Sequence, residues 1–147
     1  MSPVVFTIGH SRHAWERFRA LLKATPVEVL VDVRTHPFSW FAPFANRTRL
    51  PALLEAEGIE HRWMGDTLGG KPPDPSLYGP RRWPDFEKMR RQPALQKGIE
   101  ELAELSRERV VAIMCAEEDP AHCHRALLIA QELEHQGLTI AHIRAMG

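Results

Sequence analysis

The sequence has few cysteines, no net charge and no long apolar run. It contains 147 residues with only 2 cysteines, and 19 Lys+Arg balance 19 Asp+Glu. Two cysteines exclude a disulfide scaffold and favour a reducing compartment. The charge balance excludes a protein that holds nucleic acid by bulk electrostatics alone, although a local basic patch stays compatible with it.

Several targeting and cofactor signals are also missing. The first ten residues hold no basic region followed by a long apolar stretch, and no run approaches the ~18 apolar residues of a membrane span. We therefore expect a cytoplasmic protein without a signal peptide or a membrane partner. No dinucleotide fingerprint occurs, and Leu68-Gly69-Gly70-Lys71 lacks the spacing of a Walker loop. We expect no cofactor and no resident metal.

Short β-rich runs alternate with helical patterns along the chain. The runs cover 4–8, 27–33, 59–64, 109–115 and 138–143, and near-continuous Val/Ile is typical of parallel strands covered on both faces. Apolar stripes predict helices from a Ser11 cap to Pro26, from Asn46 or Thr48 to Gly58, and over 93–107 and 123–136. This alternation predicts one α/β domain over 1–147, a Rossmann-like three-layer sandwich with a mostly parallel sheet of about five strands. Loop insertions are expected near 35–47 and 65–84.

Most reactive side chains follow directly after these apolar runs. Because ligands of open parallel sheets bind at the carboxyl ends of the strands, we expect one crevice there, lined by polar tips from distant parts of the chain. The predicted members from the strand ends and the loop after the fourth strand are His10, Ser11, Asp32, Arg34, Cys115, Glu117, Cys123, His124 and Arg125.

Two carboxylates and one histidine are the predicted catalytic groups. A partly desolvated carboxylate can act as general base or stabilise a cation, so Asp32 and Glu117 could divide acid and base duties. His10 is the third candidate, because the usual pKa of histidine suits proton transfer. The alternatives are a structural ion pair between Asp32 and Arg34 and a structural role for His10.

The loop from Cys115 to Arg125 leads into a helix and predicts an anion pocket. Peptide N–H groups and the dipole at a helix start attract anions, and Arg125 adds a forked donor for phosphate or carboxylate. The alternative is that Arg125 pairs with Glu117 or Asp119 and only fixes the loop.

The two cysteines leave several interpretations open. Cys123, near a helix start, could be a nucleophile with a lowered pKa. Cys115 and Cys123 could form a redox pair, or bind zinc together with a nearby histidine. The alternative for Cys115 is a small buried residue at a strand end.

The segment 35–47 is rich in aromatic residues beside basic ones. Flat π faces next to guanidinium groups suit stacking on a nucleobase, for which Trp40 and Phe41 are the predicted partners. The alternatives are core packing and a homodimer interface. In the second insertion, Gly69 and Gly70 could let the backbone approach a substrate, with Lys71 as a point charge.

Five motifs together resemble the uncharacterised family called domain of unknown function 488. In chain order they are Thr7–Ser11, Val31–Arg34 with Pro37 and Ser39, Leu68–Gly70, Met114–Glu117 and Cys123–Arg125. The resemblance spans nearly the whole chain and implies a small bacterial or archaeal α/β protein. It supplies no activity.

The leading hypothesis for function is a hydrolase that acts on a nucleotide or nucleic acid and cleaves a base–sugar or phosphate bond, as a DNA glycosylase would. In this hypothesis Arg34 and Arg125 hold phosphate. One alternative is a thiol-dependent sulfur-transfer or redox protein that uses Cys115 or Cys123. Another is a non-enzymatic module that binds nucleic acid or nucleotides.

Overall fold

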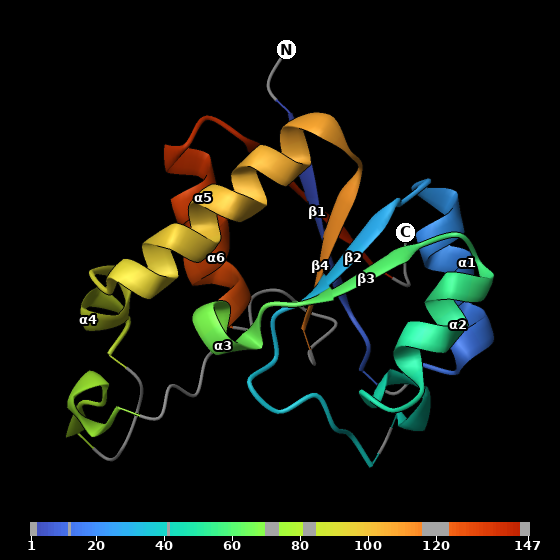
Figure 1. The fold of residues 1–147 in the computed structure, drawn as a ribbon, viewed down its shortest axis with the longest axis horizontal. Coiled ribbons are helices and arrows are strands. Elements are labelled where there is room, and N and C mark those ends of the chain that lie inside the picture. Colours follow the sequence, from blue (N-terminus) through green and yellow to red (C-terminus); the bar gives the residue numbers. More distant parts are fainter. Residues whose placement is uncertain are drawn as a thin grey trace.

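The computed structural model describes residues 3–11, 13–40, 42–69, 74–80, 85–115 and 124–144, with residues 124–127 described by their backbone alone. Within these ranges the strands and longer helices alternate along the chain (Figure 1). The strands are β1 (Val4–Gly9), β2 (Val29–Asp32), β3 (Glu60–Trp63), β4 (Val111–Cys115) and β5 (Thr139–Ile143). The helices are α1 (Trp15–Ala24), α2 (Leu50–Ala56), α3 (Gly65–Leu68), α4 (Phe86–Arg90), α5 (Pro93–Glu108) and α6 (His124–His135), with 3₁₀ helices η1 (Pro43–Ala45) and η2 (Pro75–Leu77).

All strands described form one parallel sheet in the order β3-β2-β4-β1-β5. Each predicted strand is confirmed, with ends that differ by a residue or two. The predicted Rossmann-like α/β class is also confirmed. No helix in the described ranges combines the length and apolar character that a membrane crossing needs.

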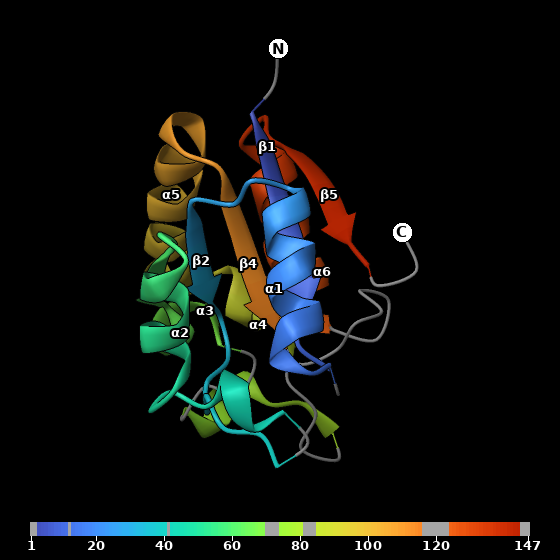
Figure 2. The same ribbon diagram turned by 90° about the vertical axis from the view of Figure 1, so that its right-hand side faces the viewer.

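The longer helices cover both faces of the sheet. Helices α1 and α2, which follow β1 and β2, lie on one face, whereas α5 and α6, which follow β3 and β4, lie on the other (Figures 1 and 2). Because the sheet order places β2 between β3 and β4, neighbouring strands there send their chains to opposite faces. Crevices at the carboxyl edge of a sheet form at such switch points.

A hydrophobic cluster lies on each face of the sheet. Leu30 and Met114 pack with α1 and α2, on what we call the α1–α2 side. Val31, Ile113 and Cys115 pack with α5 and α6, on the α5–α6 side. This division follows from strand geometry, since successive side chains point to opposite faces.

Helix ends are partly as predicted. Gly58 and Gly137 have φ of 73° and 88° directly after α2 and α6, the left-handed conformation that glycine adopts at little cost. The predicted cap at Ser11 is wrong: α1 begins at Trp15 after Ala14, with no side-chain cap. Ser11 instead has φ of 43° and turns the chain between β1 and α1.

The two predicted insertions have structure of their own. Segment 35–47 contains η1 and is closed by a hydrogen bond from the Arg47 N–H to the Pro37 carbonyl (3.0 Å). Segment 65–84 contains α3 and η2 in its described parts. The described parts of both segments lie at the carboxyl edge of the sheet (Figure 1).

Candidate functional site

A buried ion pair lies at the carboxyl end of β2. The Asp32 carboxylate accepts hydrogen bonds from Arg34 Nε (2.9 Å), Nη2 (2.7 Å) and the backbone N–H (3.0 Å). Asp32 is 1 % exposed and Arg34 3 %. The structural ion pair that the sequence left as an alternative is therefore present. The predicted role of Asp32 as a general base stays a prediction, because both carboxylate oxygens already bind Arg34.

The Arg34 guanidinium has a third nitrogen, Nη1, beyond the two that bind Asp32. Its Nη2 also donates to the Ala45 carbonyl of η1, which fixes segment 35–47 against the strand end. Its Nη1 is buried and has no hydrogen-bond partner among the described residues. An unsatisfied buried guanidinium nitrogen is costly unless a ligand or ordered water completes it. Arg34 thus fits its predicted role in binding an anionic group.

His10 lies beside this ion pair. Its Nδ1 is 2.9 Å from the Ser11 carbonyl, which can only accept, so Nδ1 carries the proton and Nε2 holds the lone pair of the neutral ring. Burial lowers the pKa of His10, with a smaller lowering from Arg34, while the Ser11 hydrogen bond and Asp32 oppose it. His10 is therefore neutral at physiological pH.

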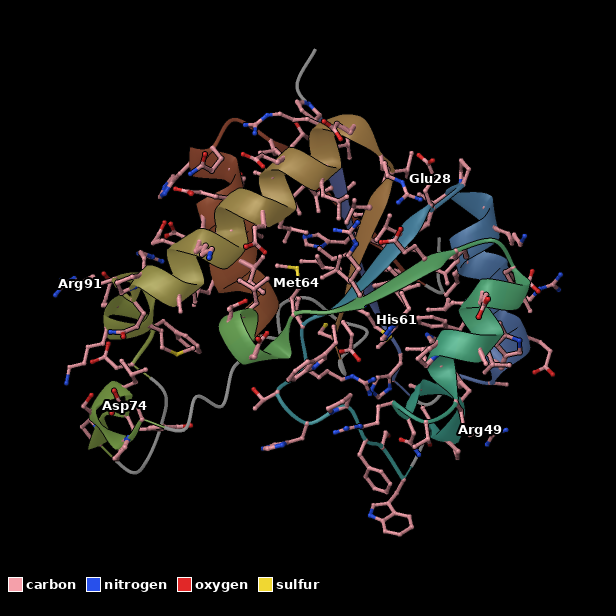
Figure 3. The ribbon with its side chains drawn as sticks, viewed as in Figure 1. Glu28, Arg49, His61, Met64, Asp74 and Arg91 are labelled. Atoms are coloured by element: carbon pink, nitrogen blue, oxygen red, sulfur yellow. The ribbon has the colours of Figure 1, made fainter. Side chains whose placement is uncertain are left out.

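His61 is a further member of the cluster, and sequence reasoning missed it. It pairs with Leu30 in the β2–β3 register, so its side chain points to the α1–α2 side, diagonal to Asp32. Figure 3 shows it on the α2 side of β3. In the described part of the chain its Nε2 is buried without a hydrogen-bond partner, and burial lowers the pKa of His61. We call His10, Asp32, Arg34 and His61 the polar cluster.

A cavity of about 190 Å³ opens beside the polar cluster. Its lining residues are Asp32, Pro37, Arg47, His61 and Trp63. They come from the ends of β2 and β3 and from segment 35–47, which matches the switch point between these strands. The cavity therefore joins a buried carboxylate, a neutral imidazole and an exposed arginine.

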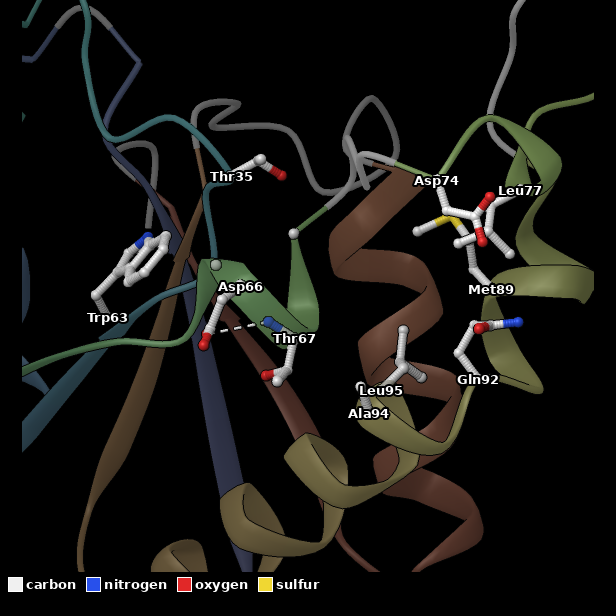
Figure 4. A pocket seen from close by; sticks show the side chains of 12 residues that line it. Thr35, Trp63, Asp66, Thr67, Asp74, Leu77, Met89, Gln92, Ala94 and Leu95 are labelled. Atoms are coloured by element: carbon white, nitrogen blue, oxygen red, sulfur yellow. Dashed lines mark hydrogen bonds between the residues drawn. The ribbon is translucent and has the colours of Figure 1, made fainter.

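A second cavity of about 300 Å³ lies on the other side of Trp63 (Figure 4). Apolar side chains of η2, α4 and α5 form one wall, and α3 forms the other. Its lining residues are Thr35, Trp63, Gly65, Asp66, Thr67, Gly69, Asp74, Leu77, Met89, Gln92, Ala94 and Leu95. The Trp63 indole donates to the Arg34 carbonyl (2.8 Å), so its ring has a fixed position between the two cavities.

Gly69 has a structural reason for lacking a side chain. A Cβ there would overlap Thr35 Oγ1 and the Gly65 carbonyl, and one at Gly65 would overlap the Arg34 carbonyl and the Trp63 indole. The two glycines thus let α3 pack against the chain that follows β2. Gly69 also lines the larger cavity, so the predicted approach of this backbone to a ligand stays compatible with the structure.

The aromatic segment divides into a buried and an exposed part. Phe44 packs in the core against Phe18 and Trp15, with ring centroids 5.1 and 5.8 Å apart, as the packing alternative predicts. Trp40 is 83 % exposed and stacks edge-on against Phe38, which is 54 % exposed, at 5.0 Å. These two rings are available to a partner.

Cys115 points away from the polar cluster. It belongs to the hydrophobic cluster of the α5–α6 side and is 3 % exposed, whereas Asp32 lies on the α1–α2 side. The sequence placed both in one crevice because both end a strand. The β2–β4 register pairs Asp32 with Met114, so Cys115 faces the other way.

Several predicted site residues lie outside the described residues: Phe41, Gly70, Lys71, Glu117 and Cys123. His124 and Arg125 begin α6, and only their backbone is described. In the described ranges, no group of three or more His, Cys, Asp or Glu side chains is arranged to hold a metal ion.

The comparisons with known proteins give a family and no activity. The family described as domain of unknown function DUF488 matches residues 14–131, a span that starts after the Gly9-His10-Ser11 motif. No curated protein and no solved structure matches the chain. The matched span covers β2, β3 and β4 and hence both cavities. Since it also covers most of the 147 residues, the chain belongs to this DUF488 family.

Proposed function

We propose that this protein is a hydrolase that acts on a nucleotide or nucleic acid, with the reacting bond held in the 190 Å³ cavity. The observation that carries the proposal is His61: a neutral imidazole whose buried Nε2 has no partner and which lines a cavity together with a carboxylate. A neutral imidazole can accept a proton from water, which is the work of a general base.

The remaining wall groups suit the same substrate. Arg47 in the cavity wall offers positive charge to a phosphate, and the Arg34 guanidinium is paired with the wall residue Asp32. The cavity is smaller than the ~300–1,000 Å³ of sites for drug-sized ligands, so it holds one part of a substrate rather than a whole nucleotide. The rest extends to the surface, where Phe38 and Trp40 offer stacking faces.

The proposed reaction is hydrolysis of a base–sugar or phosphate bond. Water attacks the sugar carbon or the phosphorus and gives a proton to the imidazole, as the bond to the leaving group breaks. The leaving group takes the bonding electrons and a proton from the imidazolium or solvent. Asp32 holds Arg34 in place and adds negative charge near a developing cation.

The test is a screen of the purified protein against nucleoside monophosphates and base-modified oligonucleotides, with product masses as the readout. His61→Gln should lower turnover by about 100-fold or more, the usual contribution of general acid–base catalysis. His135→Gln, at the exposed end of α6, is the matched control and should leave turnover unchanged.

Two results would oppose the proposal: no product from any substrate, or equal turnover of the two histidine variants. Glu117→Gln in the same assay tests the second predicted carboxylate. The assay is run in reducing buffer, because the cysteine content favours a cytoplasmic protein.

A second candidate function is a non-enzymatic nucleic-acid module, which the exposed Phe38–Trp40 pair favours. Binding of a single-stranded oligonucleotide that weakens with salt, without turnover, would support it. Trp40→Ala should then remove about 1–3 kcal/mol of binding free energy, the usual contribution of one stacked base. A concentration-dependent mass in the absence of nucleic acid would instead assign the pair to a homodimer.

A further inference from the structure

The 300 Å³ cavity has a chemistry different from that of its smaller neighbour. Its walls are mostly apolar, from Leu77, Met89 and Leu95, and Trp63 also lines it, on the other side of α3 in the view of Figure 4. Two acidic residues, Asp66 and Asp74, also line it, and among the residues that the structure describes no Lys or Arg does. These walls favour a flat ring with hydrogen-bond donors on its edge.

The two carboxylates are oriented as acceptors. Asp66 Oδ1 accepts from the Thr67 N–H (3.0 Å), which fixes the carboxylate, and no described residue donates to its Oδ2. Asp74 Oδ1 accepts from the Ser76 N–H (2.9 Å), and these Ser76 contacts lower the pKa of Asp74. Both residues are exposed and line the cavity, so their carboxylates are accessible to a ligand that enters from solvent.

The shape of the cavity favours an aromatic occupant over an alkyl amine. Trp63 provides a ring face that is held in place by its hydrogen bond to the Arg34 carbonyl. Met89 lies across the cavity, and its thioether packs well against aromatic ring edges. The volume lies at the lower end of the usual range for ligand sites, which fits one base and its sugar.

From this geometry we propose that the 300 Å³ cavity binds a nucleobase that carries an exocyclic amine, as adenine and cytosine do, with the amine donated to Asp66 or Asp74. The choice of a nucleobase rests on the proposed function. Because Trp63 lines both cavities, a base in the larger one places its sugar and phosphate toward His61 and Arg47 in the smaller one. The cavity pair then selects the base on one side of Trp63 and holds the reacting bond on the other.

The test is calorimetric titration with adenosine, cytidine and purine riboside, which has the adenosine ring without the amine. Adenosine and cytidine should bind, and purine riboside should bind about tenfold more weakly or worse, because a charged acceptor loses its donor. Asp66→Asn should weaken adenosine binding by a similar factor. Equal binding of adenosine and purine riboside would overturn the proposal, as would binding of propylamine without binding of adenosine.

A cavity-filling pair of variants tests the location. Ala94 is exposed on α5 and lines the cavity, so Ala94→Trp should abolish adenosine binding with little effect on stability. Ala52→Trp, at an exposed position of α2, is the matched control and should bind adenosine normally. Equal binding by the two variants would place the base elsewhere.

The two proposals fail in different ways. His61→Gln should lower turnover by about 100-fold or more and change adenosine affinity less than Asp66→Asn does, because His61 lines the smaller cavity and not the larger one. Adenosine binding without turnover of any substrate would support this inference and contradict the proposed hydrolase function. Turnover together with equal binding of adenosine and purine riboside would support the hydrolase function and contradict this inference.

Discussion

The two faces of the sheet differ at its carboxyl edge, although the same strands form both. On the α5–α6 side the apolar pattern continues to the strand ends, through Val33 and Cys115. On the α1–α2 side it changes after Leu30 to Asp32 and Arg34, which are equally buried. Buried charge is costly unless it is paired, so this change marks a place where burial serves something other than stability.

The difference also locates the smaller cavity. The 190 Å³ cavity lies beside the charged end of β2 and includes Asp32, whereas Cys115 lines neither of the two cavities described above. On the α1–α2 side the carboxyl edge is thus a candidate reaction site, whereas on the α5–α6 side Cys115 is part of the hydrophobic cluster.

Removing the Asp32 charge should have the largest effect on stability. Asp32→Asn leaves the Arg34 guanidinium buried without its counter-charge, and breaking such a pair costs about 3–5 kcal/mol of unfolding free energy. Urea unfolding followed by circular dichroism measures this. The control Asp66→Asn alters an exposed carboxylate and should stay within about 0.5 kcal/mol of the parent. A loss below about 1 kcal/mol for Asp32→Asn would contradict the ion-pair geometry.

Adding a methyl group at Gly65 should disturb the wall between the cavities. The new Cβ would overlap the Arg34 carbonyl and the Trp63 indole, and overpacking of this kind costs about 1–3 kcal/mol. The Trp63 indole N–H resonance should shift as its hydrogen bond to Arg34 breaks.

Gly58→Ala is the control for that variant. It is strained by its φ of 73°, but no atom lies within 4 Å of the added Cβ. It should cost about 1–2 kcal/mol and leave the indole resonance in place. An unshifted resonance in Gly65→Ala would show that α3 is less tightly packed than described.

Lowering the pH should lower the unfolding free energy, because His10 on the α1–α2 side is buried and His61 is half-buried. Burial lowers the pKa of His10 and His61, so below a pH of about 6.5 the unfolded chain binds protons that the folded chain does not. The unfolding free energy therefore falls as pH decreases from about 6.5 toward the lowered pKa values.

His61→Gln should reduce that pH dependence, measured by urea unfolding between pH 7.5 and 5, and His135→Gln should not. Identical pH profiles for the parent and His61→Gln would mean that His61 is solvated in the folded protein.

Cys115 should show the smallest effect, because its side chain is buried in the hydrophobic cluster of the α5–α6 side. In a Cys123→Ser background, a thiol reagent should label it no faster than the protein unfolds, since it is 3 % exposed. Cys115→Ala should cost about 1 kcal/mol, the usual effect of removing one small buried group, and leave hydrolysis unchanged. Rapid labelling with loss of activity would instead favour the thiol-dependent alternative.

Local patterns predict most of the sheet. Val/Ile runs identify every strand described, and Gly58 and Gly137 identify two helix ends, because these signals depend on residues close in sequence. The clustering of His10, Asp32 and Arg34 also follows from the rule that parallel strands end at one edge.

The face on which each side chain points does not follow from local patterns. Asp32 and Cys115 both end strands, but their opposite orientation depends on the pairing of Asp32 with Met114, a long-range register. The sequence does not identify His61 for the same reason. Its strand is polar, and only the pairing of His61 with Leu30 shows that its side chain points to the α1–α2 side. The short helix α3 depends on tertiary contacts of Gly65 and Gly69.

The most direct test of the contrast between the two faces is chemical-shift mapping of the ¹⁵N-labelled protein with a short single-stranded oligonucleotide. We predict shifts of the His61 imidazole, the Trp63 indole and the Asp32 amide, together with residues of the 300 Å³ cavity such as Met89, and no shift at Cys115. Shifts confined to the neighbourhood of Cys115, or none at millimolar oligonucleotide, would contradict it.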